Sequence, residues 1–457
     1  MDIDAAMLAR LQFAFTIAFH ILFPTLTIGL GGFLALLEWR WLRTGCGAYQ
    51  LLYHFWVKVF ALAFGMGVVT GVVLSYEIGT NFGRFADATG NVLGPLLGYE
   101  VLSAFFLEAG FIGVMLFGWG RVGPRMHFFA TCMVVVGTMI SAFWIIAANS
   151  WMQTPTGYRF EGGRFFVESW LDVIFNPSMP TRFLHMILAS YVAAMFVVAG
   201  VSALHLAMDR PPILARLALK NAMAVLAVVV PAQIIVGDLG GLVAEKHQPL
   251  KIAAMEGRWE TVRGAPLILF ALPDQANEVN RYEIGFPKMA SFILTHEFDG
   301  EVRGLKEKPA ADRPPVAIVF WAFRIMVGMS VAMLLVAVWG LLLSLRNRLY
   351  RSGWFQFVCI LMIPSGFVAT LAGWIAAESG RQPWTVYGLL RTSDTVSNVP
   401  AGSITVSLAL FIIVYNVLLA AYAYYIVKLF WKGPEDASLP SIAMNPIVAR
   451  RAVMPAS

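Results

Sequence analysis

The sequence has few charged residues and few cysteines. Asp, Glu, Lys and Arg make up 13% of its 457 residues, about half their share in a typical soluble domain. The 3 cysteines, Cys46, Cys132 and Cys359, lie far apart, and none belongs to a C-x-x-C or C-x-x-C-H unit. These absences argue against a soluble globular fold, a zinc ribbon and covalent attachment of a c-type haem.

Long apolar runs take the place of charged segments. Hydrophobic residues form 59% of the chain, and a helix needs about 20 apolar residues to cross a bilayer core. We therefore expect an all-α integral membrane protein with nine transmembrane helices. They are predicted at 11–38, 55–76, 93–118, 126–148, 183–206, 221–240, 316–343, 355–376 and 404–430. The acidic N-terminus lacks a basic n-region, so the first run is interpreted as a retained span.

One long hydrophilic segment, 241–315, divides the chain into six helices over 1–240 and three helices with a short tail over 316–457. The net charge of +6 comes from Lys and Arg in the short connections between runs, which argues against nucleic-acid binding. One set of alternate connections holds about 14 of these cations and the other about 7, and the richer side is expected to be cytoplasmic. This predicts an outer N-terminus, a cytoplasmic C-terminus and a periplasmic 241–315 segment.

Four side chains that can bind iron lie in the outer parts of four different spans. They are His20, His185, Met326 and Glu378. Ionisable groups at membrane depth are costly and usually functional, and imidazole, thioether and carboxylate groups are iron ligands. Their shared depth suggests a cofactor layer in the outer leaflet. The alternative is that the histidines form helix–helix hydrogen bonds and Met326 is ordinary packing.

Two carboxyls on the third span, Glu100 and Glu108, are separated by just over two helical turns, about 12 Å along the axis. Ser141 on the fourth span could join them through water. Spaced intramembrane acids of this kind suit a proton relay, and the alternative is a pair of interhelical hydrogen bonds.

The remaining ionisable residues near the spans have simpler interpretations. Arg324 and Arg381, close in sequence to Met326 and Glu378, can each pair with a haem propionate; the alternative is an interfacial arginine that extends toward water. We interpret five further histidines as surface or interface residues: His54, His127, His205, His247 and His296.

Several short strings resemble subunit I of the cytochrome bd quinol oxidases. Gly380-Arg381-Gln382-Pro383-Trp384, which follows Gly373-Trp374-Ile375-Ala376-Ala377-Glu378, is similar to the GRQPW signature of that family. Five further strings match in order and spacing: Arg10-Leu11-Gln12-Phe13, Phe105-Phe106-Leu107-Glu108, Trp151-Met152-Gln153-Thr154-Pro155, Lys251-Ile252-Ala253-Ala254-Met255-Glu256 and Phe323-Arg324-Ile325-Met326. The matches extend over nearly all nine predicted spans.

The resemblance implies a role for each matching residue. His185 and Met326 would ligate a low-spin haem b, and His20 and Glu378 would serve two high-spin haems where oxygen is reduced. Trp374 would lie near the haems. Which high-spin haem each of His20 and Glu378 faces stays open.

The rest of the resemblance concerns quinol and protons. Lys251 and Glu256 would lie in the quinol-binding loop, and Glu100, Glu108 and Ser141 in the proton supply. The substrate would be ubiquinol or menaquinol. The loop has the short form, and 399–403 resembles the cyanide-insensitive branch, so the third cofactor is expected to be haem d or a further haem b.

The resemblance also implies a setting and a physiological role. The chain would lie in the bacterial cytoplasmic membrane with oxidase subunit II and, in some members, small single-helix subunits. It would oxidise quinol on the periplasmic side and reduce oxygen with cytoplasmic protons, an electrogenic reaction without a pump. Two other classes stay open, a proton-coupled transporter and a membrane cytochrome that only passes electrons.

Overall fold

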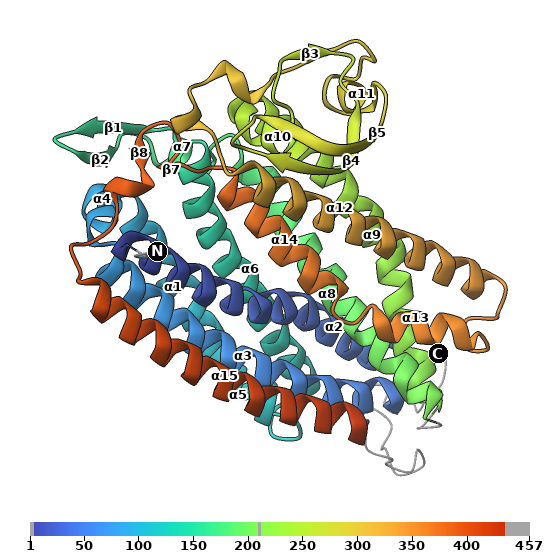
Figure 1. Ribbon diagram of the computed structural model, residues 1–457. Helices are drawn as coiled ribbons and strands as arrows, with labels where there is room; N and C mark the ends of the chain where they lie inside the picture. Colours follow the sequence, from blue (N-terminus) through green and yellow to red (C-terminus); the bar gives the residue numbers. More distant parts are fainter. Residues whose placement is uncertain (1–3, 209–211, 435–457) are drawn as a thin grey trace.

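The computed structural model describes residues 4–208 and 212–434. Within these ranges nine helical segments are long and apolar enough to cross a membrane, so the predicted number of spans is confirmed. Most segments extend beyond the predicted run at both ends, because helices continue past the apolar core of a bilayer; the third ends at Phe117, one residue short of the predicted 118. The segments form one bundle (Figure 1).

The nine segments contain twelve α-helices of the bundle and one π-helix. The first three segments are α1 (Ala5–His20) with α2 (Leu22–Thr44), α3 (Gly47–Asn81), and α4 (Gly83–Tyr99) with the π-helix Glu100–Phe105 and α5 (Phe106–Phe117). Next come α6 (Pro124–Gln153), α8 (Met179–Ala207) and α9 (Pro212–His247). The last three contain α12 (Val316–Leu345), α13 (Gly353–Leu361) with α14 (Ser365–Ser379), and α15 (Ala401–Lys432).

Two segments are broken beside a proline. Helix α1 ends at His20 and α2 begins at Leu22, and Pro24 cannot donate a backbone hydrogen bond to His20. Helices α13 and α14 are separated in the same way just before Ser365, next to Pro364. The first break places His20 at the C-terminal end of α1.

Most of the extramembrane structure lies at one end of the bundle, which we name the loop end. It carries α10 (Pro249–Glu256), α11 (Met289–Thr295) and an antiparallel ribbon of β4 (Leu267–Asp274) and β5 (Val279–Phe286), seen at the top of Figure 1. Three shorter antiparallel pairs complete the strands: β1 (Tyr158–Glu161) with β2 (Arg164–Val167), β3 (Val262–Arg263) with β6 (Glu301–Val302), and β7 (Trp384–Val386) with β8 (Leu390–Arg391). The short helix α7 (Trp170–Ile174) follows β2. The predicted helical class is therefore confirmed, with short strands confined to the connections.

Helix α8 occupies the centre of the bundle and packs against α2, α6, α9, α13 and α14. Small residues allow this close approach, because a Cβ added to Gly29 would collide with the Ser190 carbonyl oxygen and one added to Gly366 would collide with Ala193. Helix α15 lies on the outside, and only 11% of its most apolar window is buried. Its exposed face is available to lipid or to another subunit.

Two histidines that we interpreted as surface or interface residues are buried, so that interpretation was wrong for them. His127 is 2% exposed, and its Nδ1 lies 2.7 Å from Glu38 Oε1. His205 is 3% exposed, and its Nε2 lies 2.7 Å from the Phe430 carbonyl oxygen. Both lie near helix ends but face the bundle. His127 joins α6 to α2 through its contact with Glu38, and His205 joins α8 to α15 through its contact with Phe430.

Candidate functional site

All four predicted iron ligands lie in the loop-end half of their spans. His20 ends α1, His185 is in the second turn of α8, Met326 is in the third turn of α12, and Glu378 is the penultimate residue of α14. The N-terminal part of α1 belongs to this end because Arg10 Nη2 donates to Gln382 Oε1 at 3.3 Å. The structure therefore gathers the four side chains toward one end of the bundle.

His20 lies in the seam between α1 and α3. Its Nδ1 is 2.9 Å from the Thr70 hydroxyl, which fixes the orientation of the ring. A Cβ on Gly71, the next residue of α3, would lie 3.3 Å from His20 Cε1, so the glycine gives the imidazole its room. The other ring nitrogen, Nε2, is left for a ligand role.

His185 lies between α8 and α9, and its Nε2 is 3.2 Å from Gln233 Nε2. Its Nδ1 is buried without a hydrogen-bond partner among the described residues, as is Gln233 Oε1. Gly237 of α9 again makes room, since a Cβ there would lie 3.1 Å from His185 Cε1. Buried polar groups rarely lack partners, so an orphaned imidazole nitrogen fits a group that supplies one.

Met326 faces α14 from α12. A Cβ on Gly373 would lie 2.9 Å from Met326 Sδ, so the thioether lies directly against a helical glycine. Trp374, the next residue of α14, is half-buried. Three of the four candidate ligands thus have a glycine on the facing helix. This arrangement leaves space beside the two imidazole rings and the thioether.

Glu378 is held by side chains from three elements. The amides of Asn149 and Gln153 in α6 both donate to its Oε1 at 3.1 Å. Arg381 pairs with its Oε2, and Arg182 of α8 donates to Asn149. A carboxylate has about four lone-pair sites. Three are used here, so one remains for a further partner such as iron.

Three basic side chains surround this single carboxylate, and two of them, Lys251 and Arg381, are buried. Lys251 and Arg381 are 4% and 6% exposed, and the charges of both, with that of Arg182, act on Glu378. Two nitrogens of Arg381, Nε and Nη1, are buried without a partner in the part of the chain that the structure describes. A buried cation surplus is costly unless anions neutralise it, so the site fits an anionic group such as haem propionate.

The two predicted quinol residues lie on α10, and both are buried. Lys251 Nζ donates to the side-chain oxygens of Gln153 and Gln248, and Cγ of Lys251 lies against Gly380. Burial lowers the pKa of Lys251 well below its ordinary value, and Arg182 adds to this. Within the predicted quinol loop, both residues therefore lie on a short helix, Pro249–Glu256, and their side chains face the protein interior.

Glu256 has a different partner, Arg324 of α12, whose Nη2 lies 3.1 Å from Glu256 Oε2. Burial raises the pKa of Glu256, and the Arg324 guanidinium opposes that rise. Arg324 also donates to the carbonyl oxygens of Ile268 at 2.7 Å and Met255 at 3.0 Å. Three of its nitrogens are thus used within the protein, so Arg381 fits a propionate better than Arg324 does.

The predicted proton residues meet where α5 and the π-helix pack against α6. Ser141 donates directly to Glu100 Oε1 at 2.7 Å, so no bridging water is needed between them. Glu108 is 7% exposed, and its Cγ would lie 2.6 Å from a Cβ on Gly137. The π-helix Glu100–Phe105 interrupts the regular helix that we expected between the two acids and changes their relative rotation.

Some residues of the site were missed in the sequence. Arg182 was counted only as a topological charge, although its position one turn before His185 was a usable signal. Asn149 and Gln153 carry no sequence signal alone, because amides are common in helices. In the part of the chain that the structure describes, no group of three or more His, Cys, Asp and Glu could hold a bare metal ion. Haem needs only one or two protein ligands.

The fold and the site define a multi-pass helical membrane protein with soft ligands and surplus buried cations near one face. The family described as cytochrome bd terminal oxidase subunit I matches residues 8–434. The chain belongs to this family, whose members are haem-containing terminal oxidases of the respiratory chain that use quinol.

Two curated relatives and one solved structure show how far the similarity extends. Cytochrome bd ubiquinol oxidase subunit 1 of Bacillus subtilis (strain 168) is 38% identical over 444 residues, 94% of each chain. Cytochrome bd-II ubiquinol oxidase subunit 1 of Escherichia coli (strain K12) is 31% identical over 502 residues, 94% of this chain and 97% of the relative. The bd oxidase structure from Geobacillus thermodenitrificans has a TM-score of 0.89 at 30% identity, covering 94% of this chain and 99% of that one.

Proposed function

We propose that this chain is the haem-carrying, quinol-oxidising subunit of a terminal oxidase that reduces oxygen to water. The observation that carries the proposal is the cluster at the loop end, where the buried side chains of Lys251, on α10, and Arg381 lie beside Glu378. In this cluster, Lys251 of the proposed quinol site lies next to Glu378 and Arg381 of the proposed haem site.

The residues that would hold the haems are those that face a helical glycine or keep a ligand atom that makes no hydrogen bond. His185 and Met326 would hold a low-spin haem b, while His20 and Glu378 would serve a high-spin haem b and a second high-spin haem, either haem d or b. Arg381, Arg182 and Trp374 would surround these cofactors. Bound haems supply one-electron transfer and the binding of oxygen.

Quinol oxidation would take place beneath α10. A quinol loses two electrons and two protons to become a quinone, so its site needs hydrogen-bonding groups and a proton acceptor. Lys251 would donate a hydrogen bond to one quinol oxygen. Glu256 would accept a proton from a hydroxyl, and Arg324 would orient Glu256 and stabilise the form that accepts. Ubiquinol and menaquinol both have the oxygens that this arrangement requires.

Proton supply would come from the opposite face. Reducing one oxygen molecule to two waters consumes four electrons and four protons. Glu108 and then Glu100, hydrogen-bonded to Ser141, would pass protons from the cytoplasm toward the loop end, which faces the periplasm in this proposal. The protons of quinol leave on the outer side. Charge is then separated without a pump, worth about 2.3 kcal/mol per charge per 100 mV.

The setting follows from the spans and the exposed helix. A multi-pass protein of this family lies in the bacterial cytoplasmic membrane, and oxidase subunit II would cover part of the bundle. Segment 1–240 with its six helices, and segment 316–457 with three helices and a short cytoplasmic tail, would flank the periplasmic quinol loop at 241–315.

The testing experiment is a visible spectrum of the purified complex combined with oxygen uptake. Haem bands in the reduced spectrum and quinol-dependent oxygen uptake are the expected results. A protein without haem would be a transporter or another carrier, and a haem protein that takes up no oxygen with quinol would only pass electrons. The spectrum also shows whether haem d is present.

A further inference from the structure

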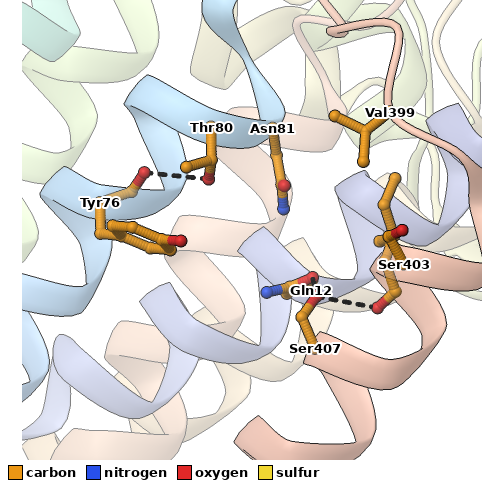
Figure 2. Close-up of a pocket in the computed structure, with 8 residues that line it drawn as sticks. Gln12, Tyr76, Thr80, Asn81, Val399, Ser403 and Ser407 are labelled. Carbon is orange, nitrogen blue, oxygen red and sulfur yellow. Dashed lines mark hydrogen bonds between the residues drawn. The ribbon is translucent and has the colours of Figure 1, made fainter.

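A polar pocket opens between α1, α3 and α15, away from the quinol loop (Figure 2). Its volume is about 200 Å³, enough for several waters at roughly 30 Å³ each. Six of its eight lining residues carry an amide or hydroxyl group: Gln12, Tyr76, Thr80, Asn81, Ser403 and Ser407. Water can hydrogen-bond to each of these groups.

Two buried groups beside the pocket lack partners among the described residues. Asn81 is 7% exposed and its Nδ2 has no acceptor within 4–208 and 212–434; Figure 2 shows its amide pointing toward Gln12 across the pocket. One turn earlier on α3, Glu77 is fully buried, and its Oε2 has no donor within the same ranges. A carboxyl at membrane depth with an unused oxygen is a functional candidate rather than a packing residue.

The polar groups continue from the pocket toward His20. On α1, Gln12, Thr16 and His20 are spaced four residues apart, so they share one face of the helix. The Thr16 hydroxyl lies 2.9 Å from Glu77 Oε1 and 3.0 Å from the Gln12 carbonyl oxygen. Thr70, two turns before Glu77 on α3, is the hydroxyl that touches His20.

This seam therefore has a polar side chain at each step of about 6 Å, the rise of four residues. An interhelical hydrogen-bond pair would explain Thr16 and Glu77 alone. It does not explain the orphaned Glu77 oxygen, the orphaned Asn81 amide or the open pocket at the end of the seam. Water bound along the seam would satisfy both orphaned groups.

We propose that the α1–α3 seam is a water passage, and that it releases product water from the His20 site to the loop-end surface through the pocket. The inference rests on the proposed function in naming oxygen reduction as the source of that water. Two waters form for each oxygen molecule and must leave a closed, largely apolar bundle. Glu77, Thr16, Gln12 and Asn81 would bind them in turn.

Thiol labelling of the assembled complex tests the passage without reference to turnover. A cysteine reacts with 2-aminoethyl methanethiosulfonate as a thiolate, so it needs contact with water. In a Ser407→Cys variant the thiol lies in the pocket. Thr405→Cys on the same helix is the matched control, because Thr405 is exposed but does not line the pocket. Peptide mass spectrometry separates each site from the native cysteines.

We expect Ser407→Cys to react at least 10-fold faster than Thr405→Cys. A Thr16→Cys variant, nearly isosteric, should also be labelled, and adding Ser407→Leu should slow that labelling about 10-fold while adding Thr405→Leu does not. Equal labelling rates in Ser407→Cys and Thr405→Cys, or unlabelled Thr16→Cys in a complex with a normal haem spectrum, would overturn the passage. Oxygen uptake by the wild type tests the proposed function separately.

Discussion

The pair of Glu256 and Arg324 gives the sharpest test of the proposed quinol site. Glu256→Gln keeps the shape of the side chain and an oxygen that can accept from Arg324, but it cannot take up a proton. A hydrogen bond to a charged group is worth about 1.5–3 kcal/mol. At 1.36 kcal/mol for each factor of ten, kcat/KM for quinol should fall roughly 10- to 150-fold while all haems remain bound.

The reverse truncation should act differently. Arg324→Met removes donors to Glu256 and to two backbone carbonyl oxygens at 2.7 and 3.0 Å. It leaves the buried Glu256 carboxylate without its hydrogen-bonded cation, which costs about 3–5 kcal/mol. Arg324→Met should therefore lower the thermal midpoint of the complex, and adding Glu256→Gln should restore part of it.

The pH profile of quinol oxidation supplies an independent readout. Burial raises the pKa of Glu256, and only the ionised form can accept a proton. The wild-type rate should therefore fall as the pH is lowered through that pKa, and Glu256→Gln should lose this dependence. The measurement is oxygen uptake over a series of quinol concentrations at each pH. A variant that stays within twofold of the wild type throughout would refute the assignment.

Three further predictions concern other parts of the proposed mechanism. Met326→Leu keeps volume and apolarity, so the complex should assemble but lose its low-spin haem signal; an unchanged low-spin spectrum would remove Met326 from the ligands. Glu108→Gln should slow the membrane-potential transient after oxygen is flashed onto reduced enzyme in vesicles, more than it slows reduction of the low-spin haem by quinol; an intact transient would make Glu108 a packing acid. Because Lys251 has a lowered pKa, the unfolded chain binds more protons, so stability should rise with pH between the folded and unfolded pKa. Lys251→Met should flatten that rise in thermal midpoint, and an unaltered slope would contradict it.

The spans could be predicted from the sequence because bilayer thickness sets a length that apolar runs must reach. Their ends could not, since α9 continues to His247 through residues that are polar enough to be counted as loop. The break after His20 also had a signal, Pro24, but the π-helix after Tyr99 had none. A π-turn depends on packing against α6 rather than on local residue preferences.

The residues of the site likewise fall into those that the sequence reveals and those that only the fold reveals. Residues that are costly in a membrane, such as His185 and Glu378, stand out in any apolar run. Arg182 did not, because a cation near a span end has an ordinary role in setting orientation. Glu77 lies one residue beyond the predicted span 55–76, and its significance depends on partners from α1 that only the fold reveals.

Helix α6 shows how one bundle can keep quinol chemistry apart from proton supply. Its loop-end residue Gln153 accepts from Lys251, Ser141 donates to Glu100, and Gly137 lies against Glu108. Gln153 and Gly137 are 16 residues apart, about 24 Å along the helix, in a hydrocarbon core about 30 Å thick. A proton taken up near Glu108 would therefore cross most of the membrane before reaching the quinol end, whereas a proton released from quinol would already be at the surface. In the proposed reaction, this spacing along α6 would separate the site of proton uptake from the site of proton release and so make oxygen reduction electrogenic.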